Sequence, residues 1–103
     1  MAGRYPNFDY KKLDKVIHNR LRLAILSSLY RSDEVDFVSL RNAVSATDGN
    51  LSVQLMNLED VGYIVTNRTV YKTRLQTNVA LTNEGKLALK KYKSLLENWL
   101  QGL

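Results

Sequence analysis

The fold is decided by residues 47–62, TDGNLSVQLMNLEDVG, together with the YIVT that follows them. Thr47 is suited to cap a helix, because its hydroxyl accepts a hydrogen bond from a free backbone N–H group. Asp48 suits the positive end of the helix dipole, and Gly62 is suited to end the helix in the left-handed conformation. Apolar residues recur at helical spacing on one face, at Leu51, Leu55, Leu58 and Val61. This pattern predicts a short capped helix with one buried face.

The remaining positions of this helix carry short neutral side chains, at Asn50, Ser52, Val53, Gln54 and Asn57. Amides pair bidentately with adenine and a valine methyl packs on thymine, so the composition favours a recognition helix for A·T-containing half-sites. A solvated helix face is the alternative interpretation. After Gly62, the β-branched and aromatic residues from Tyr63 to Thr66 indicate a strand. A helix that leads directly into a β-hairpin predicts a winged helix.

The predicted hairpin, or wing, carries concentrated positive charge. The net charge of +5 is compatible with a nucleic-acid partner but is also common in proteins that bind none. Residues 47–62 contain three acids and no base, whereas residues 63–82 contain three bases and no acid. Those bases are Arg68, Lys72 and Arg74. Strands are expected at residues 63–68 and 75–81, with a tip at residues 69–74. We expect the three bases of this wing to contact DNA phosphates; an ordinary solvated tip is the alternative.

Three helices are predicted ahead of the recognition helix. Helical spacing places them at residues 11–18, 20–30 and 37–44. Asn19 and Asp36 are the expected caps of the second and third. The second is apolar on nearly all sides and belongs at the centre of the core. Ser45 and Ala46 then form the tight turn of a helix-turn-helix.

A last helix, at residues 83–103, carries a broad apolar stripe. Thr82 or Asn83 is its expected cap. The stripe repeats at alternating spacings of three and four residues, as a coiled-coil seam does. Its members are Leu89, Tyr92, Leu96, Trp99 and Leu103, widened by Leu95 and Leu100. Such a stripe exceeds what the core of a small domain needs, so we expect these residues to form the interface of a homodimer.

Four stretches of the chain resemble the winged-helix transcriptional regulators of the ArsR and MarR type: LRLAILSSLY, VDFVSLRNAV, TDGNLSVQLMNLEDVGYI and ALTNEGKLAL. The similarity is greatest to a small prokaryotic subgroup in which DGNLS opens the recognition helix and LT-x-x-G closes the wing, and it runs from Leu13 to about the end of the chain. The resemblance implies base or phosphate contacts at Asp48, Asn50, Ser52, Val53, Gln54 and Asn57. The chain departs from these relatives, which often carry Lys or Arg near Val53 and Asn57.

Composition argues against other classes of protein. The 103 residues are 45% hydrophobic and include one His and no Cys, so we expect one domain without disulfides, a metal or a cofactor. His18 follows Asp14 by one helical turn, but no further His or clustered carboxylates complete a catalytic or metal site, and no enzyme is expected. Without a membrane-length apolar run, and without a signal-peptide core in MAGRYP, a cytoplasmic protein is expected.

These patterns together predict a mainly α winged helix-turn-helix with a β-hairpin wing. We expect an irregular arm at residues 1–10, a DNA-binding domain at residues 11–82 and a dimerisation helix at residues 83–103. The expected function is sequence-specific binding of double-stranded DNA by a homodimeric transcriptional regulator. The acids of the recognition helix leave open a second interpretation, in which the winged helix is an adaptor that binds another protein. The sequence does not identify a small-molecule effector.

Overall fold

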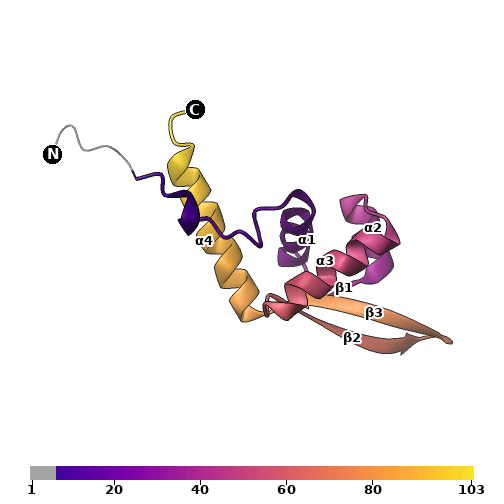
Figure 1. The fold of residues 1–103 in the computed structure, drawn as a ribbon. Helices are drawn as coiled ribbons and strands as arrows, with labels where there is room; N and C mark the ends of the chain where they lie inside the picture. The colour runs from indigo at the N-terminus through magenta and orange to yellow at the C-terminus, as the bar shows by residue number, and fades with distance from the viewer. Residues whose placement is uncertain (1–6) are drawn as a thin grey trace.

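Four α-helices and a small antiparallel sheet make up the part of the chain that the computed structural model describes, residues 7–103 (Figure 1). The elements follow in the order η1 (Tyr10–Lys12, a 3-10 turn), α1 (Arg20–Tyr30), β1 (Val35–Asp36), α2 (Phe37–Val44), α3 (Asp48–Asp60), β2 (Ile64–Tyr71), β3 (Arg74–Leu81) and α4 (Asn83–Trp99). The strands pair antiparallel in the order β1-β3-β2. This arrangement confirms the predicted mainly α winged helix with a β-hairpin wing.

Each α-helix begins after a polar residue that the sequence predicts as its cap. The caps are Asn19, Asp36, Thr47 and Thr82. In each case a side-chain oxygen accepts a hydrogen bond, at 2.9 to 3.2 Å, from the backbone N–H three residues later. Because the first N–H groups of a helix have no partner inside it, these bonds fix where each helix starts. Hydrogen bonds from Ser39 also hold the pKa of the Asp36 carboxyl below its ordinary value.

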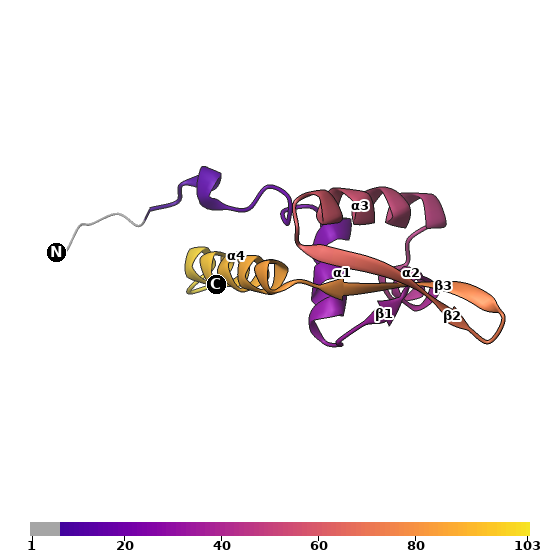
Figure 2. The same ribbon diagram turned by 90° about the horizontal axis from the view of Figure 1, so that it is seen from below.

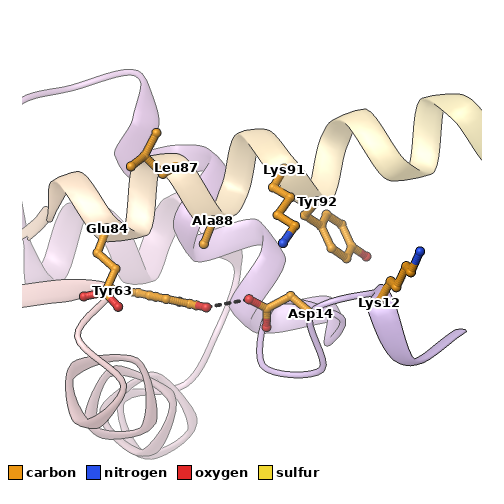
Figure 3. A pocket seen from close by; sticks show the side chains of 8 residues that line it. All are labelled: Lys12, Asp14, Tyr63, Glu84, Leu87, Ala88, Lys91 and Tyr92. Atoms are coloured by element: carbon orange, nitrogen blue, oxygen red, sulfur yellow. Dashed lines mark hydrogen bonds between the residues drawn. The ribbon is translucent and has the colours of Figure 1, made fainter. Parts of the chain in front are cut away.

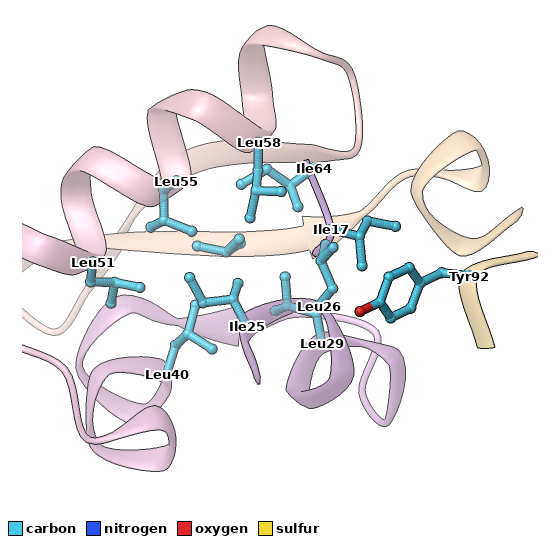
Figure 4. Packing of buried hydrophobic residues seen from close by; sticks show 11 residues of the cluster. Ile17, Ile25, Leu26, Leu29, Leu40, Leu51, Leu55, Leu58, Ile64 and Tyr92 are labelled. Carbon is cyan, nitrogen blue, oxygen red and sulfur yellow. The ribbon is translucent and has the colours of Figure 1, made fainter. Parts of the chain in front are cut away.

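The hydrophobic core lies between α1, α3 and the sheet (Figure 4). Its buried side chains are Ile17, Ile25, Leu26, Leu29, Leu40, Leu51, Leu55, Leu58, Ile64, Val79 and Tyr92. Leu51, Leu55 and Leu58 point from α3 towards α1, as the helical spacing predicts, and burying each contributes roughly 1.5–3 kcal/mol. The fourth predicted member, Val61, lies just beyond α3 and is 40% exposed. This anchoring fixes which face of α3 points outward.

The predicted helix at residues 11–18 is wrong. Only the short η1 forms there, and residues 15–19 follow as turns and bends. Oδ1 of Asp14 accepts the backbone N–H groups of Val16 at 2.8 Å and Ile17 at 3.1 Å, so a side chain takes over bonds that a helix would make between backbone groups. The apolar spacing instead reflects the complete burial of Ile17 in the core.

The wing has longer strands and a tighter turn than predicted. Ladder pairing runs without interruption from Ile64 opposite Leu81 to Tyr71 opposite Arg74. The turn is therefore only Lys72 and Thr73, with Lys72 in the left-handed region at φ 59. The position of this turn was not predicted, because the sequence carries no glycine there. Strand β1 was also missed, because two residues paired with β3 are too short to show a pattern.

The start of α4 is joined to the end of α3. Thr82 donates its hydroxyl hydrogen to the oxygen of Gly62 at 2.6 Å and its N–H to the oxygen of Tyr63 at 3.1 Å. Gly85 lies so close to this junction that a Cβ atom would overlap the carbonyl oxygen of Tyr63. Gly62 has φ +84, so it ends α3 in the left-handed conformation, as predicted. The LTNEG segment thus fixes α4 relative to α3.

The wing and α4 project from the body in opposite directions (Figures 1 and 2). The structure measures 66 × 24 × 21 Å, and its radius of gyration is 16.3 Å, against about 13 Å for a compact domain of this length. Helix α4 ends at Trp99 and not at the predicted residue 103, because Leu100 leaves helical geometry and Gly102 takes φ 90. Within residues 7–103, no helix is long and apolar enough to cross a membrane. Part of the predicted arm, residues 1–6, lies outside the described residues.

Candidate nucleic-acid interface

The outer face of α3 exposes most of the residues that the sequence predicts as DNA contacts. Asn50, Ser52, Val53 and Asn57 are exposed, with Val53 at 53%. They face outward because the leucines of α3 occupy the opposite side of the helix. Short amides, a hydroxyl and a methyl-bearing side chain on one rigid helix form a surface that suits the edges of base pairs.

Gln54 differs from its neighbours on this face, because it is half-buried and bonded to another helix. Nη1 of Arg22, in α1, donates to Oε1 of Gln54 at 2.6 Å. Nδ2 of Asn57 donates to the same oxygen at 3.4 Å. The sequence analysis did not single out Arg22, because no local pattern connects residues 32 positions apart.

Asp48, at the start of α3, forms an ion pair. Nη1 of Arg41, in the last turn of α2, lies 2.8 Å from Oδ1 of Asp48. The carboxylate is therefore offset by a cation at the end of the helix where a DNA backbone would approach. Arg41 was not among the predicted DNA residues, although it is a basic residue in the helix just before the helix-turn-helix turn.

The acids at the other end of α3 lie beside the base of the wing. The hydroxyl of Thr66 donates to Glu59, at 3.2 and 3.3 Å from its two carboxylate oxygens. Nδ2 of Asn67 donates to Glu34, in the loop before β1, at 3.1 Å. The carboxylates of Glu59 and Glu34 therefore hold strand β2 to the body of the protein. Glu59 is at the end of α3, far from its first turns.

The three predicted cations of the wing lie in its outer half, and they do not share one face. Arg68 is opposite Thr77 and Arg74 is opposite Tyr71. Opposed residues of a ladder share a face and neighbours along a strand alternate, so Arg68 and Arg74 lie on different faces. Lys72 is in the turn between them, with Nζ 5.6 Å from the centre of the Tyr71 ring. All three side chains are exposed, so the outer half of the wing carries positive charge on both faces.

A cavity of 380 Å³ lies behind α3, between the N-terminal segment and the first turns of α4 (Figure 3). It is lined by Lys12, Asp14, Tyr63, Glu84, Leu87, Ala88, Lys91 and Tyr92. The hydroxyl of Tyr63 donates to Oδ2 of Asp14 at 2.5 Å, and burial together with this bond raises the pKa of Tyr63 to about 12. Nδ1 of His18 is hydrogen-bonded to the hydroxyl of Tyr92 at 2.7 Å. Asp14 and His18 are thus each hydrogen-bonded to a tyrosine. Among residues 7–103, no three side chains are grouped so that they could hold a metal ion.

The predicted interface residues of α4 differ in exposure. Leu89, Leu95, Leu96 and Trp99 are half-buried, whereas Leu100 is 53% exposed and Leu103 fully exposed. Tyr92 is only 5% exposed, so it belongs to the core of the single chain and not to the predicted subunit interface. Leu103 lies beyond the end of α4 and does not continue the seam.

An open groove of 1290 Å³ runs between α1 and α4 beside these residues. Its apolar lining is Leu23, Tyr30, Leu89, Leu96 and Leu100, and its rim carries charges that include Arg31, Lys90 and Glu97. A groove this large beside a projecting helix is a surface that a second chain could cover. The exposed Leu87, at 69%, was not predicted and lies at the cavity of Figure 3 instead.

A helix-turn-helix whose second helix exposes amides, followed by a basic hairpin, defines a winged helix-turn-helix protein. The family model described as "Winged helix DNA-binding domain" matches residues 21–100, and the chain belongs to this family. Over 78 residues it is 36% identical to an uncharacterized protein of Methanocaldococcus jannaschii, a match that covers 76% of this chain and 85% of the relative.

Solved structures of regulators share this fold. The transcriptional regulator homologue protein from Pyrococcus horikoshii OT3 superposes with a TM-score of 0.83 at 26% identity, over 90% of this chain and 94% of that one. MepR of S. aureus, solved as a DNA complex, gives a TM-score of 0.74 at 22% identity, over 89% of this chain and 75% of MepR. Because MepR is only 22% identical to this chain, the similarity to MepR shows a shared fold and nothing more.

Proposed function

We propose that the protein binds double-stranded DNA sequence-specifically, as a homodimeric prokaryotic transcriptional regulator of the ArsR and MarR type. Helix α3 enters the major groove and the wing lies on the flanking backbone. One observation carries the proposal: the core holds the amide face of α3 outward, directly before a hairpin that has three cations and no acid. Membership of the winged helix DNA-binding domain family supports it.

Phosphate contacts come first from the wing, because its cations are exposed on both faces of its outer half. Such contacts release condensed counterions from DNA, and they give affinity without reading sequence. Base contacts are assigned to Asn50, Val53, Gln54 and Asn57, with Ser52 near the backbone. Asp48 does not prevent docking, since Arg41 offsets its charge.

Dimerisation is assigned to α4, supported by its projection from the body and by the groove beside it. Burying one exposed Leu or aromatic side chain completely contributes roughly 1.5–3 kcal/mol. Leu89, Leu95, Leu96 and Trp99 are already half-buried in the single chain, so each contributes part of that value, and together with the exposed Leu100 they form the proposed dimer contact. Two copies related by a twofold axis would present two α3 helices to successive major grooves.

DNA binding is tested by measuring affinity for a selected duplex at several salt concentrations. Arg68→Ala or Arg74→Ala should weaken binding on all sequences and lower the slope of log K against log salt by about 0.9 per lost contact, which is two contacts in a dimer. Lys86→Ala, which removes an exposed charge from α4, is the matched control and should leave the slope unchanged. Unchanged slopes in both wing variants would show that the wing does not contact DNA.

Sedimentation equilibrium at micromolar concentration tests the dimer. The chain has a mass of 11.8 kDa, so the intact protein should sediment at about twice that value. Leu96→Asp combined with Trp99→Asp should yield monomers, whereas Asn98→Asp, an exposed neighbour on α4, should not. A monomeric wild type, or a dimer that survives the double substitution, refutes this assignment.

A protein-binding adaptor is the second candidate function. It is favoured by exposed apolar side chains on α3 and just after it, Val53, Met56 and Val61, which lie near Glu59 and Asp60. Binding to a protein partner would depend little on salt, whereas DNA binding depends on it steeply. The salt titration described above therefore separates the two functions.

A further inference from the structure

Arg22 links α1 to the recognition helix through two hydrogen bonds. Nη1 donates to Oε1 of Gln54 and Nε donates to the backbone oxygen of Val16, each at 2.6 Å. The guanidinium group is planar and always charged, so two bonds from different nitrogens fix its plane as well as its position. Arg22 is thus a positioned donor at the flank of α3.

The bonds to Gln54 determine which atoms of its amide group remain available to hydrogen-bond a partner. Its Oε1 has two lone pairs and two donors, Arg22 Nη1 at 2.6 Å and Asn57 Nδ2 at 3.4 Å. Because arginine has no acceptor, turning the amide around would place its NH₂ group against the guanidinium. Gln54 therefore offers outward only the N–H groups of its Nε2 atom.

Adenine is read by both halves of an amide, since the oxygen accepts from N6 while the nitrogen donates to N7. We propose that Arg22 sets the base preference of the recognition helix by restricting Gln54 to base edges that present acceptors. Those edges are O6 and N7 of guanine, N7 of adenine and O4 of thymine. The restricted Gln54 separates adenine from guanine poorly. Asn50 differs, because its side-chain amide makes no hydrogen bond within residues 7–103. This inference rests on the proposed function, because it requires α3 to lie in the major groove.

Site selection from random duplexes tests the inference. The proteins are wild type, Gln54→Ala, Arg22→Met, the double variant Arg22→Met with Gln54→Ala, and Arg20→Met. Arg22→Met removes both donors and keeps an unbranched apolar stem, while Arg20→Met removes the same charge from an exposed position in the same turn of α1. The base pair whose preference changes in Gln54→Ala is the one that faces Gln54.

At that base pair, wild type should accept adenine and guanine about equally. Arg22→Met frees Oε1 and should favour adenine over guanine by about 5- to 150-fold, the discrimination of one bidentate pair. Arg20→Met should select the wild-type motif. The double variant should show the relaxed preference of Gln54→Ala. A sixth protein, Arg22→Lys, keeps a donor for Oε1 and should select the wild-type motif. A general loss of fold in Arg22→Met would abolish selection of any duplex and would not shift the preference at this one base pair.

Three results overturn the inference while leaving DNA binding intact. They are a wild type that already selects adenine at this base pair, an Arg22→Met motif identical to wild type, and a Gln54→Ala motif with no change at any pair. The results for wild type and for Gln54→Ala need no Arg22 variant, so each can refute the inference even if Arg22→Met does not fold. A wild type that binds no duplex instead refutes the proposed function, and the inference with it.

Discussion

Replacing Gly85 by alanine should separate α4 from the recognition helix. A Cβ atom at this position would overlap the carbonyl oxygen of Tyr63, and would lie 3.0 Å from its carbonyl carbon and 3.1 Å from Cδ2 of Leu81. Two of these three atoms belong to the backbone and cannot move aside alone. The start of α4 must therefore shift away from the α3–β2 junction.

The magnitude follows from the contacts at this junction. Forcing an extra methyl group into a packed site costs about 1–3 kcal/mol. The shift also strains the two hydrogen bonds from Thr82 to Gly62 and Tyr63, each worth about 0.5–1.5 kcal/mol. The better helix propensity of alanine offsets up to about 1 kcal/mol. These terms sum to a net loss of about 1–6 kcal/mol, which weakens a domain of ordinary stability.

Urea unfolding followed by circular dichroism, at one fixed protein concentration, measures this loss. Gly49→Ala is the matched control, because Gly49 lies inside α3 and a Cβ there meets nothing within 4 Å. Gly49→Ala should raise the free energy of unfolding by no more than about 0.5–1 kcal/mol, the value for the middle of a helix, because Gly49 lies in the first turn of α3. If Gly85→Ala lies within about 0.5 kcal/mol of wild type, a typical surface effect, the close packing of α4 on the α3–β2 junction is not a constraint on the fold.

Two further predictions concern the cavity and the ion pair. Tyr63→Phe should destabilise the fold by about 1–2 kcal/mol, because Asp14 loses its hydrogen bond. Since the folded pKa of Tyr63 is about 12, above its ordinary value of 10.0, its contribution to stability should be complete below pH 10 and lost as the pH rises towards 12. The unfolding of Tyr63→Phe should not show this loss. Asp48→Asn should tighten DNA binding, because it frees Arg41 for a phosphate, and the salt slope should rise. Asp60→Asn, the same change at the far end of α3, should have a smaller effect, and an equal gain in both would point to overall charge alone.

Local chemistry made several features of this protein predictable from the sequence. The caps at Asn19, Asp36 and Thr47 each bond a backbone group three residues away, so composition and spacing are sufficient to locate them. The buried face of α3 follows in the same way from the period of its leucines. Strand boundaries were less accurate, because the turn at Lys72 and Thr73 lacks the usual glycine.

The arrangement of the candidate DNA surface depends on contacts between distant parts of the chain. Three side-chain hydrogen bonds join residues that are far apart in the sequence. Arg22 and Gln54 are separated by 32 positions, Asp14 and Tyr63 by 49, and His18 and Tyr92 by 74. No periodicity or cap signal joins such pairs, because each exists only after the core has brought α1, α3 and α4 together. The sequence by itself therefore determined which helix carries amides on its exposed face. Only the tertiary structure decided which of those amides keep both a donor and an acceptor free, because Arg22 reaches Gln54 only in the folded chain.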